Sequence, residues 1–539
     1  MKLLWRILLT ITVLLCSMMI VLSVYAGSEK VLTQEFVFPA YVDPVLGYDH
    51  VCRNVIVNIY DPLVFPSNKG EPQPCVAKSW DISPDGLTYT FFLQEGIKFH
   101  DGTELTAEDV KFSLDRTQTM GSGVAFMFTE VKNVEVIDKY TVVFHLKNPV
   151  GAFISILMNL FILNKDLVMA NIDKESKEYG DLGDYGGKFL LHYDAGSGPY
   201  ILKDINIGEF VNMLKNQNYW KKINADAPDV VRFQHISPEV ALKTLMARRE
   251  VDICDPDVSL ETLNELDKIE GVDLLDFPLQ MEMIFQINTQ KPPTDDIHFR
   301  KAMAWAFDYS VINEIYPRCP QAAGPAAHEV PGFDPTVFQY HRDLDRAKEE
   351  LKQSKYYEKL DQYPVNVQYG VNLPRFNKLA LLLMSNMKDI GIIIKLEPLP
   401  WMTQIENYSK LETSPNVNLG WFSTDYPEVG SIFDSLYASK SENTFNIHYL
   451  RNPEIDTMIA DAFSTINREE RFKKYSKILH SIVDLCPDIY LFDYYQTNAY
   501  ASGYIYLPQS EGKGIPLSGY KFYLPNIKVY PEKKEELRR

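Results

Sequence analysis

The chain has 539 residues and a net charge of −18 at neutral pH, with 72 acidic against 54 basic side chains. An acidic surface of this kind repels nucleic acid and anionic lipid, so we expect neither as a partner. More than ~500 residues are too many for one hydrophobic core, and we expect two or more lobes.

The first 26 residues have the features of a secretory signal peptide. Lys2 and Arg6 give a positive start, residues 7–24 are largely apolar, and Ala26 provides a small residue before a cleavage point at Gly27. The alternative is an uncleaved anchor helix, because the apolar run approaches the ~17–25 residues that cross a bilayer. We expect an exported protein, periplasmic or extracellular.

Cysteine usage is consistent with export but leaves the pairing open. Cys16 lies in the leader after two leucines, where a lipid-modified cysteine requires a small residue, so we expect no lipid anchor. An oxidising compartment permits up to two disulfides among the remaining five, and Cys52 with Cys75 and Cys319 with Cys486 are the pairings considered. Those five are Cys52, Cys75, Cys254, Cys319 and Cys486. No metal-ligand spacing accompanies them, so we predict neither a metal nor a cofactor.

The first clear elements form a compact α+β unit. Residues 87–94 alternate apolar and polar side chains between two turns, which predicts a strand, and a second short strand follows at 97–99. Thr106 begins a helix, because Asp109 stands three residues later as in a capping box. The alternation over residues 131–146 predicts a hairpin.

Strands and helices alternate in the rest of the chain. The alternation predicts mixed sheets covered by helices, an α/β fold. Strands are expected at 199–202, 210–215, 230–235, 251–253, 364–369, 392–396 and 488–492. Helices are expected at 238–248, with Val240, Leu242 and Leu245 facing inwards, and at 299–316, 344–351, 376–390 and 468–485. The charged tail at 532–539 is expected to fray.

Sequence motifs for catalysis are missing. Residues 196–198, Gly-Ser-Gly, lack the pattern of a nucleophile elbow, and there is no phosphate-binding or dinucleotide-binding glycine motif. His100, in Phe-His-Asp-Gly, is interpreted as a turn residue that hydrogen-bonds locally. We therefore expect no enzymatic activity.

Aromatic side chains gather near one carboxylate late in the chain. Trp401 follows a proline, and Trp421, Phe422 and Tyr426 surround Asp425 within six residues. Such a segment can line an apolar ligand pocket with one placed polar group. The same aromatics could equally belong to the core, with Asp425 capping a turn.

The order of several motifs resembles the bacterial extracellular solute-binding protein family 5, the dipeptide- and oligopeptide-binding components of ABC importers. The clearest are SPDGLTYTF at 83–91 and KFHDGT at 98–103, followed by LTAEDV at 105–110. Further matches lie at 58–63, 74–80, 196–200, 287–293, 296–308 and 381–393.

The resemblance implies a two-lobed clamp of the periplasmic-binding-protein type. Lobe I would comprise residues 28–283 and 488–539, with an extra subdomain at about 61–195, and lobe II would comprise 284–487. The lobes would close on a solute by hinge motion. The protein would act as a monomer and deliver the solute to the permease subunits of an importer with a cytoplasmic ATPase.

The resemblance also implies site residues. In peptide-binding relatives an Asp after a Gly-Trp segment pairs with the peptide's amino terminus, which assigns this role to Asp425. Trp421, Phe422 and Trp401 would form pocket walls, with Tyr426 in the same segment, and Tyr369 is a further candidate at the end of a lobe II strand.

One departure from the family pattern leaves the ligand open. Relatives commonly continue with Pro-Asp-Pro or Asn-Glu-Pro, whereas residues 427–430 here are Pro-Glu-Val-Gly. A peptide is the leading ligand, and an oligosaccharide, an opine-like conjugate or a chelated metal are alternatives on the same clamp. A secreted hydrolase, and a sensor or chaperone on this scaffold, are the functional rivals.

Overall fold

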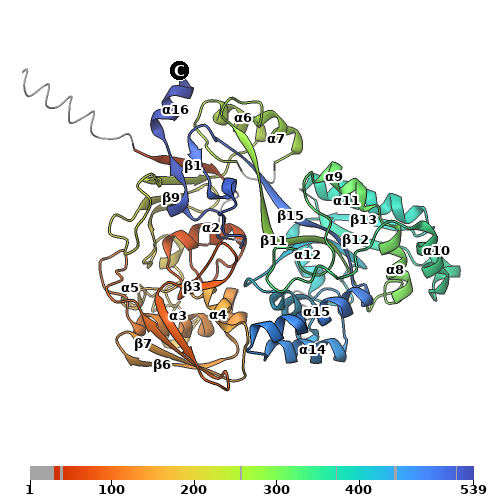
Figure 1. The fold of residues 1–539 in the computed structure, drawn as a ribbon, viewed down its shortest axis with the longest axis horizontal. Helices are drawn as coiled ribbons and strands as arrows, with labels where there is room; N and C mark the ends of the chain where they lie inside the picture. Colours follow the sequence, from red (N-terminus) through yellow and green to blue (C-terminus); the bar gives the residue numbers. More distant parts are fainter. Residues whose placement is uncertain (1–28, 37–40, 255–257, 372, 442–445, 518) are drawn as a thin grey trace, which may run out of the picture.

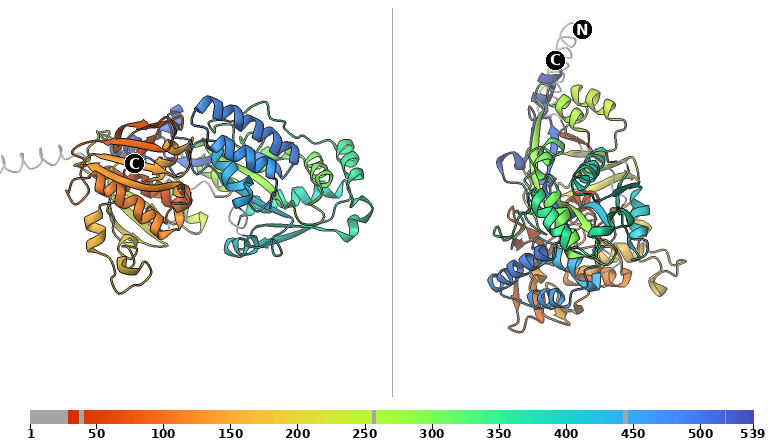
Figure 2. Two further views of the ribbon diagram at one scale, coloured as in Figure 1. Left: turned by 90° about the horizontal axis from the view of Figure 1, so that it is seen from below. Right: turned by 90° about the vertical axis from the view of Figure 1, so that its right-hand side faces the viewer.

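The computed structural model describes residues 29–539 apart from 37–40, 255–257, 372, 442–445 and 518. The signal peptide expected at 1–26, with Cys16, lies outside the described residues. Two bodies lie side by side, joined by two long strands (Figure 1). The first holds the N-terminal half and the chain's last residues, and the second holds the segment between them (Figure 2). Within the described residues, no helix is both long and apolar enough to cross a membrane.

The first body contains a four-stranded mixed sheet in the order β1-β10-β9-β8. Its strands are β1 (Val31–Glu35), β10 (Val230–Gln234), β9 (Phe210–Lys215) and β8 (Tyr200–Asn206). Helix α2 (His50–Ile59) shares one core with this sheet and with buried residues from the C-terminal segment 500–529. That shared core explains why the chain's two ends lie in one body.

A smaller antiparallel sheet forms the α+β unit, in the order β4-β5-β7-β6. Its strands are β4 (Ala77–Ile82), β5 (Thr88–Leu93), β7 (Thr141–Leu146) and β6 (Val131–Asp138). The predicted capping box is confirmed, because Thr106 and Asp109 bond each other's backbone at the start of α3 (Ala107–Met120). The unit has its own hydrophobic cluster.

The second body is built on a five-stranded sheet in the order β13-β12-β14-β11-β15. Its strands are β13 (Ile394–Leu399), β12 (Val365–Gly370), β14 (Val417–Ser423), β11 (Asp273–Ile287) and β15 (Asp488–Tyr500). Its main helices are α8 (Ile297–Ala306), α10 (Leu344–Gln353), α11 (Pro374–Lys388), α12 (Trp401–Tyr408), α14 (Pro453–Phe463) and α15 (Arg468–Leu485). The predicted helix at 468–485 is confirmed at both ends.

The antiparallel strands β11 and β15 run from one body into the other (Figure 1). Their pairing is interrupted between Pro278 and Glu282, where the register shifts. An interruption of this kind bends and twists a strand pair. The expected lobe boundaries, 283 and 488, fall within β11 and at the first residue of β15, and we keep them as a proposal for where the lobes meet.

Two predicted strands and one helix are wrong. Residues 97–99 and 251–253 contribute only isolated bridges, through Lys98 and Ile253, because each pairs over one residue and cannot extend a ladder. The helix predicted at 299–316 ends at Ala306. The side chain of Asp308 then accepts the amide of Ser310 and starts a new turn, which competes locally with helix continuation.

Two further expectations, one on helix α6 and one on the C-terminal tail, are also corrected. In α6 (Glu239–Ala247) Leu242 is buried, but Val240 is 71% exposed because it lies about 200° around the helix from Leu242. The tail does not fray. It forms helix α16 (Pro531–Arg538), and Lys534 Nζ lies 2.7 Å from Oδ1 of buried Asp252.

Neither considered disulfide forms. All five described cysteines are buried, and no disulfide joins any two of them. Cys75 lies instead against a polar group, with Lys221 Nζ 3.1 Å from its Sγ. Burial raises the pKa of this thiol to about 12. A protonated buried thiol packs as a small hydrophobe and is unreactive.

Candidate solute-binding site

Three neighbouring parallel strands end at one edge of the second sheet. Strand β12 runs parallel to both β13 and β14, so their carboxyl ends share an edge. Tyr369 lies at the end of β12, Trp401 follows β13, and Trp421 and Phe422 lie near the end of β14. Ligands of open α/β sheets bind outside such carboxyl ends. The fold thus places the predicted aromatic residues along one edge.

These aromatic residues differ in how they are held. Tyr369 is buried, and its hydroxyl donates to Asn377 Oδ1 at 2.8 Å. Trp421 packs edge-on against Phe376, with ring centroids 4.9 Å apart. Trp401 is 63% exposed at the start of α12. Tyr369 and Trp421 are therefore held by neighbouring side chains, whereas most of Trp401 is exposed.

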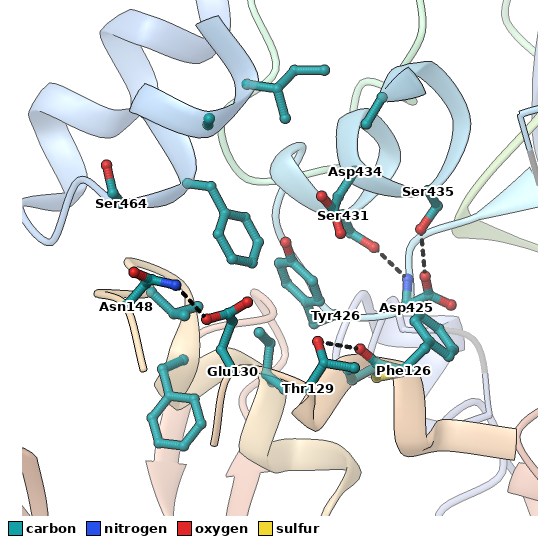
Figure 3. Close-up of a pocket in the computed structure, with 18 of the residues that line it drawn as sticks. Phe126, Thr129, Glu130, Asn148, Asp425, Tyr426, Ser431, Asp434, Ser435 and Ser464 are labelled. Carbon is teal, nitrogen blue, oxygen red and sulfur yellow. Dashed lines mark hydrogen bonds between the residues drawn. The ribbon is translucent and has the colours of Figure 1, made fainter. Parts of the chain in front are cut away.

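Asp425 lies two residues after the end of β14, and its carboxylate has no paired cation among the described residues. Ser435 Oγ donates to its Oδ2 at 3.0 Å, and its backbone amide donates to Ser431 Oγ at 2.8 Å (Figure 3). None of the ion pairs in the described part of the chain includes Asp425. Burial raises its pKa to about 6, although the Ser435 hydrogen bond and the Arg53 charge act in the opposite direction.

A polar chain connects Asp425 to the first body. Asn159, at the end of a short 3-10 turn (Leu157–Asn159), donates from Nδ2 to the backbone oxygen of Asp425 at 2.9 Å. Its Oδ1 accepts a hydrogen bond from Arg53 Nη1 in α2. The side-chain amide of Asn159 therefore contacts both the guanidinium of Arg53 and the backbone oxygen of Asp425.

A cavity of about 540 Å³ lies between the α+β unit and the second body. One wall comes from Phe126, Thr129 and Glu130, and the other includes Asp425 and Tyr426 (Figure 3). Of the six predicted site residues, only Asp425 and Tyr426 line this cavity. The other four lie along the strand edge described above.

Tyr426 crosses the boundary between the bodies. It is 5% exposed and belongs to the hydrophobic cluster of the α+β unit, although its chain segment follows β14. Its hydroxyl is buried without a hydrogen-bond partner among the described residues. The ring thus provides apolar contact between the bodies.

The residues that depart from the family pattern have a packing role. Glu428 is buried and accepts two hydrogen bonds from Arg471, at 2.8 and 3.0 Å, and one from Tyr475 at 3.2 Å. Gly430 lies so close to Tyr475 that a Cβ would come 2.3 Å from its hydroxyl oxygen. The unusual sequence after Tyr426 therefore anchors the loop to α15.

The sequence reasoning missed Arg53, Asn159 and Ser435. Arg53 could have been noticed from the sequence, because it is the only arginine or lysine in α2 and most of its neighbours there are apolar. Asn159 and Ser435 carried no signal, since their partners lie on distant segments.

Two lobes joined by a pair of long strands, with a partly buried carboxylate near the place where they meet, define the class of clamp-like solute-binding proteins. Residues 71–444 match the bacterial extracellular solute-binding proteins of family 5, in the part designated its middle. The match covers more than half of the chain, and the chain belongs to this family.

Known relatives share nearly the whole chain. The probable D,D-dipeptide-binding periplasmic protein DdpA of Escherichia coli (strain K12) is 27% identical over 490 residues, which are 88% of this chain and 90% of that protein. The periplasmic binding protein DppA of Helicobacter pylori, solved with the peptide STSA, superposes with a TM-score of 0.76 at 23% identity over 93% and 98% of the two chains. The dipeptide-binding protein of Pseudoalteromonas sp. SM9913 with Met-Leu gives 0.77 at 20% identity over 93% and 100%. The two structures establish the two-lobed fold.

Proposed function

We propose that this protein captures a peptide-like solute between its lobes outside the cytoplasm and delivers it unchanged to the permease of an ABC importer. The observation that carries the proposal is Asp425, a partly buried carboxylate near the meeting point of the lobes that forms no ion pair with any described residue. The dipeptides and peptide named for the relatives support the same class of ligand.

The amino terminus of the solute pairs with Asp425. A buried carboxylate without a counter-ion is costly, and an incoming ammonium offsets that cost while losing its own hydration. Trp401, Trp421 and Phe422 supply apolar walls along the strand edge, and Tyr369 stiffens the end of β12. The solute touches both lobes only when they are closed, so binding favours the closed state.

The leader accounts for the export of the protein from the cytoplasm. Residues 1–26 direct export and are removed, and the mature acidic protein works as a monomer that docks on its permease. The cargo is released intact, because transport requires capture and no bond cleavage.

The test uses native mass spectrometry of protein purified from its host, which reports the mass of a retained solute. Binding of that solute to the wild type and to Asp425→Asn is then measured by calorimetry. We expect a solute with a free amine whose affinity collapses in the variant. Unchanged affinity would overturn the pairing, and loss of the intact solute during prolonged incubation would instead indicate a hydrolase.

An opine-like conjugate or an oligosaccharide is the second candidate, favoured by one observation. Trp401 presents a largely free aromatic ring, which suits a sugar face. A retained solute without an amine, sensitive to Trp401→Ala and insensitive to Asp425→Asn, would select this candidate.

A further inference from the structure

Two buried carboxylates face each other across the strands that link the bodies (Figure 1). Glu282 in β11 is paired in register with Asp493 in β15, and the two residues are 5% and 0% exposed. Cross-strand partners carry their Cβ atoms about 4.5–5.5 Å apart on one face of a sheet. Each group keeps one fully enclosed oxygen, Glu282 Oε1 and Asp493 Oδ1, without a hydrogen-bond partner among the described residues. The two carboxylates are therefore close together and poorly solvated.

Only one of the two carboxylates has a positive partner. Asp493 Oδ2 accepts the backbone amide of His328 at 3.0 Å and a second hydrogen bond from the His328 ring. That second bond raises the pKa of the imidazole, so the pair favours an ionised Asp493 beside an imidazolium. Glu282 has neither an ion pair nor a side-chain hydrogen bond among the described residues. Of the two groups, Glu282 is the one that is suited to carry a proton.

Among the described residues, the charges that act on Glu282 oppose its ionisation. Burial raises its pKa well above the usual value, and the negative charges of Asp493 and Asp488 raise it further. Asp488 has its own partners, since Tyr437 and His448 bond its carboxylate at 2.7 and 2.6 Å. The other groups that face Glu282 bring no positive charge: Phe422 in β14 and Tyr490 in β15. A protonated Glu282 escapes the repulsion, and its hydroxyl gains a hydrogen to donate.

Glu282 lies where the linking strands bend. It is the first residue of β11 to pair again with β15 beyond the interruption after Pro278. Gln280, inside the interruption, donates its amide to the oxygen of Pro516 in the first body at 3.3 Å. Its side-chain oxygen accepts from Thr424 Oγ1 in the second body at 3.0 Å. Groups from both bodies thus cover the strand beside Glu282, and a hinge motion that separates the bodies would let water reach it.

We propose that Glu282 carries a proton while the bodies are in contact and loses it when they separate, so that closure of the clamp takes up one proton at the hinge. The proton comes from bulk water and returns to it, and the O–H bond of Glu282 is the one that forms and breaks. Beside Asp493 the neutral acid is favoured, whereas water that enters on opening stabilises the ionised form. The inference concerns the hinge alone and holds for any solute.

The direction of the pH dependence follows from the state that holds the proton. The pKa of Glu282 is raised in the closed state, so its contribution to closure is fully present below the ordinary glutamate value of 4.5. This contribution is lost as the pH rises through the closed-state value. One coupled proton changes the closure equilibrium by at most about tenfold per pH unit. The clamp should therefore open more readily in alkaline solution.

The first experiment measures the distance between the bodies in the empty mature protein as a function of pH. Spin labels are attached at Ile137→Cys in the first body and Leu381→Cys in the second, where the native side chains are exposed. The native cysteines of the described residues are all buried, so they compete little for the label. Double electron–electron resonance is recorded for wild type, Glu282→Gln and His328→Gln, with the exposed Glu314→Gln as the matched control.

In the wild type and in Glu314→Gln, the population with separated bodies should grow between about pH 7 and about pH 9, by up to about tenfold per unit. Glu282→Gln mimics the protonated side chain and should stay closed throughout. His328→Gln should keep the dependence, because Glu282 is still present. The inference is overturned by a wild type without the dependence, by its persistence in Glu282→Gln, or by its loss in His328→Gln alone.

Infrared spectroscopy detects the proton directly. A protonated carboxyl has a carbonyl stretch that an ionised carboxylate lacks, and this band should be present in the wild type at about pH 8. Asp425 is ionised there, because its pKa is about 6. The band should be missing from Glu282→Gln. A wild type without the band contradicts the inference and leaves solute binding, and with it the proposed function, untouched.

A second variant supplies the test if Glu282→Gln does not fold. Asp493→Asn retains Glu282 and removes a negative charge beside it. The carboxyl band should therefore disappear at a lower pH in this variant than in the wild type. An unchanged pH would show that the two carboxylates do not interact, and the inference would fail.

Discussion

Replacing Asp425 with asparagine should stabilise the empty protein at neutral pH while removing its affinity for amines. The pKa of this carboxyl rises from 3.8 to about 6 in the folded protein, so folding favours the protonated form. Above pH 6 the ionised Asp425 side chain lowers the free energy of unfolding by at most about 3 kcal/mol. Because the residue keeps some exposure, we expect about 1–2 kcal/mol after solvent screening.

The sign of the pH dependence follows from the direction of that shift. A raised carboxyl pKa contributes stability below the unfolded value, near 4, and this contribution is lost as the pH rises through about 6. Asparagine does not titrate. Asp425→Asn should therefore match the wild type near pH 4 and exceed it at pH 7, in urea unfolding followed at both values.

Binding should depend on pH in the opposite sense. An ammonium ligand requires the ionised carboxylate, so the affinity of the wild type should fall about tenfold per unit as the pH drops below 6. The exposed Asp484→Asn is the matched control, with the same chemical change away from the cavity, and should behave as wild type in both assays. An Asp425→Asn protein that is less stable than wild type at pH 7, or that binds an amine normally, would refute the reasoning.

The remaining predictions concern packing. Glu428→Gln weakens the buried pair with Arg471 and should lower the free energy of unfolding by about 3 kcal/mol or more in urea titrations; a loss below 1 kcal/mol would contradict this. Tyr426→Phe removes a buried hydroxyl that has no hydrogen-bond partner among the described residues, and the free energy of unfolding should stay equal or rise by about 1 kcal/mol. The control Tyr437→Phe loses a 2.7 Å hydrogen bond to Asp488 and should cost about 1–3 kcal/mol; equal losses in both variants would show that Tyr426 is hydrogen-bonded after all. Thr106→Ala removes the capping box of α3 and should cost about 1 kcal/mol in thermal unfolding, and no loss would show that Asp109 alone begins the helix.

The candidate site was only partly readable from the sequence. The segment 421–426 drew attention through its composition, and the structure places Asp425 and Tyr426 at a cavity between the lobes. Composition could not show that the ring of Tyr426 belongs to the core of the α+β unit. Whether an aromatic side chain faces a ligand or a core depends on what packs against it, and the packing partner is more than two hundred residues away along the chain.

The local sequence pattern correctly predicted those elements that are stabilised by contacts between nearby residues. Period-two alternation defined β5 and the β6–β7 hairpin, and the Thr106–Asp109 pair fixed the start of α3. These signals work because the interacting groups lie within a few residues of each other. They failed at Asp308, where a local side-chain bond ended a helix that the apolar spacing favoured.

By itself the sequence determined an acidic chain with a set of family motifs and predicted its two-lobed α/β fold. Only the tertiary structure decided which charges remain uncompensated. The amide of Asn159 meets the backbone of Asp425 across 266 residues of chain, and Arg53 reaches the same amide from a third segment. A counter-ion is a matter of distance in space, and distance between remote segments is set by the fold.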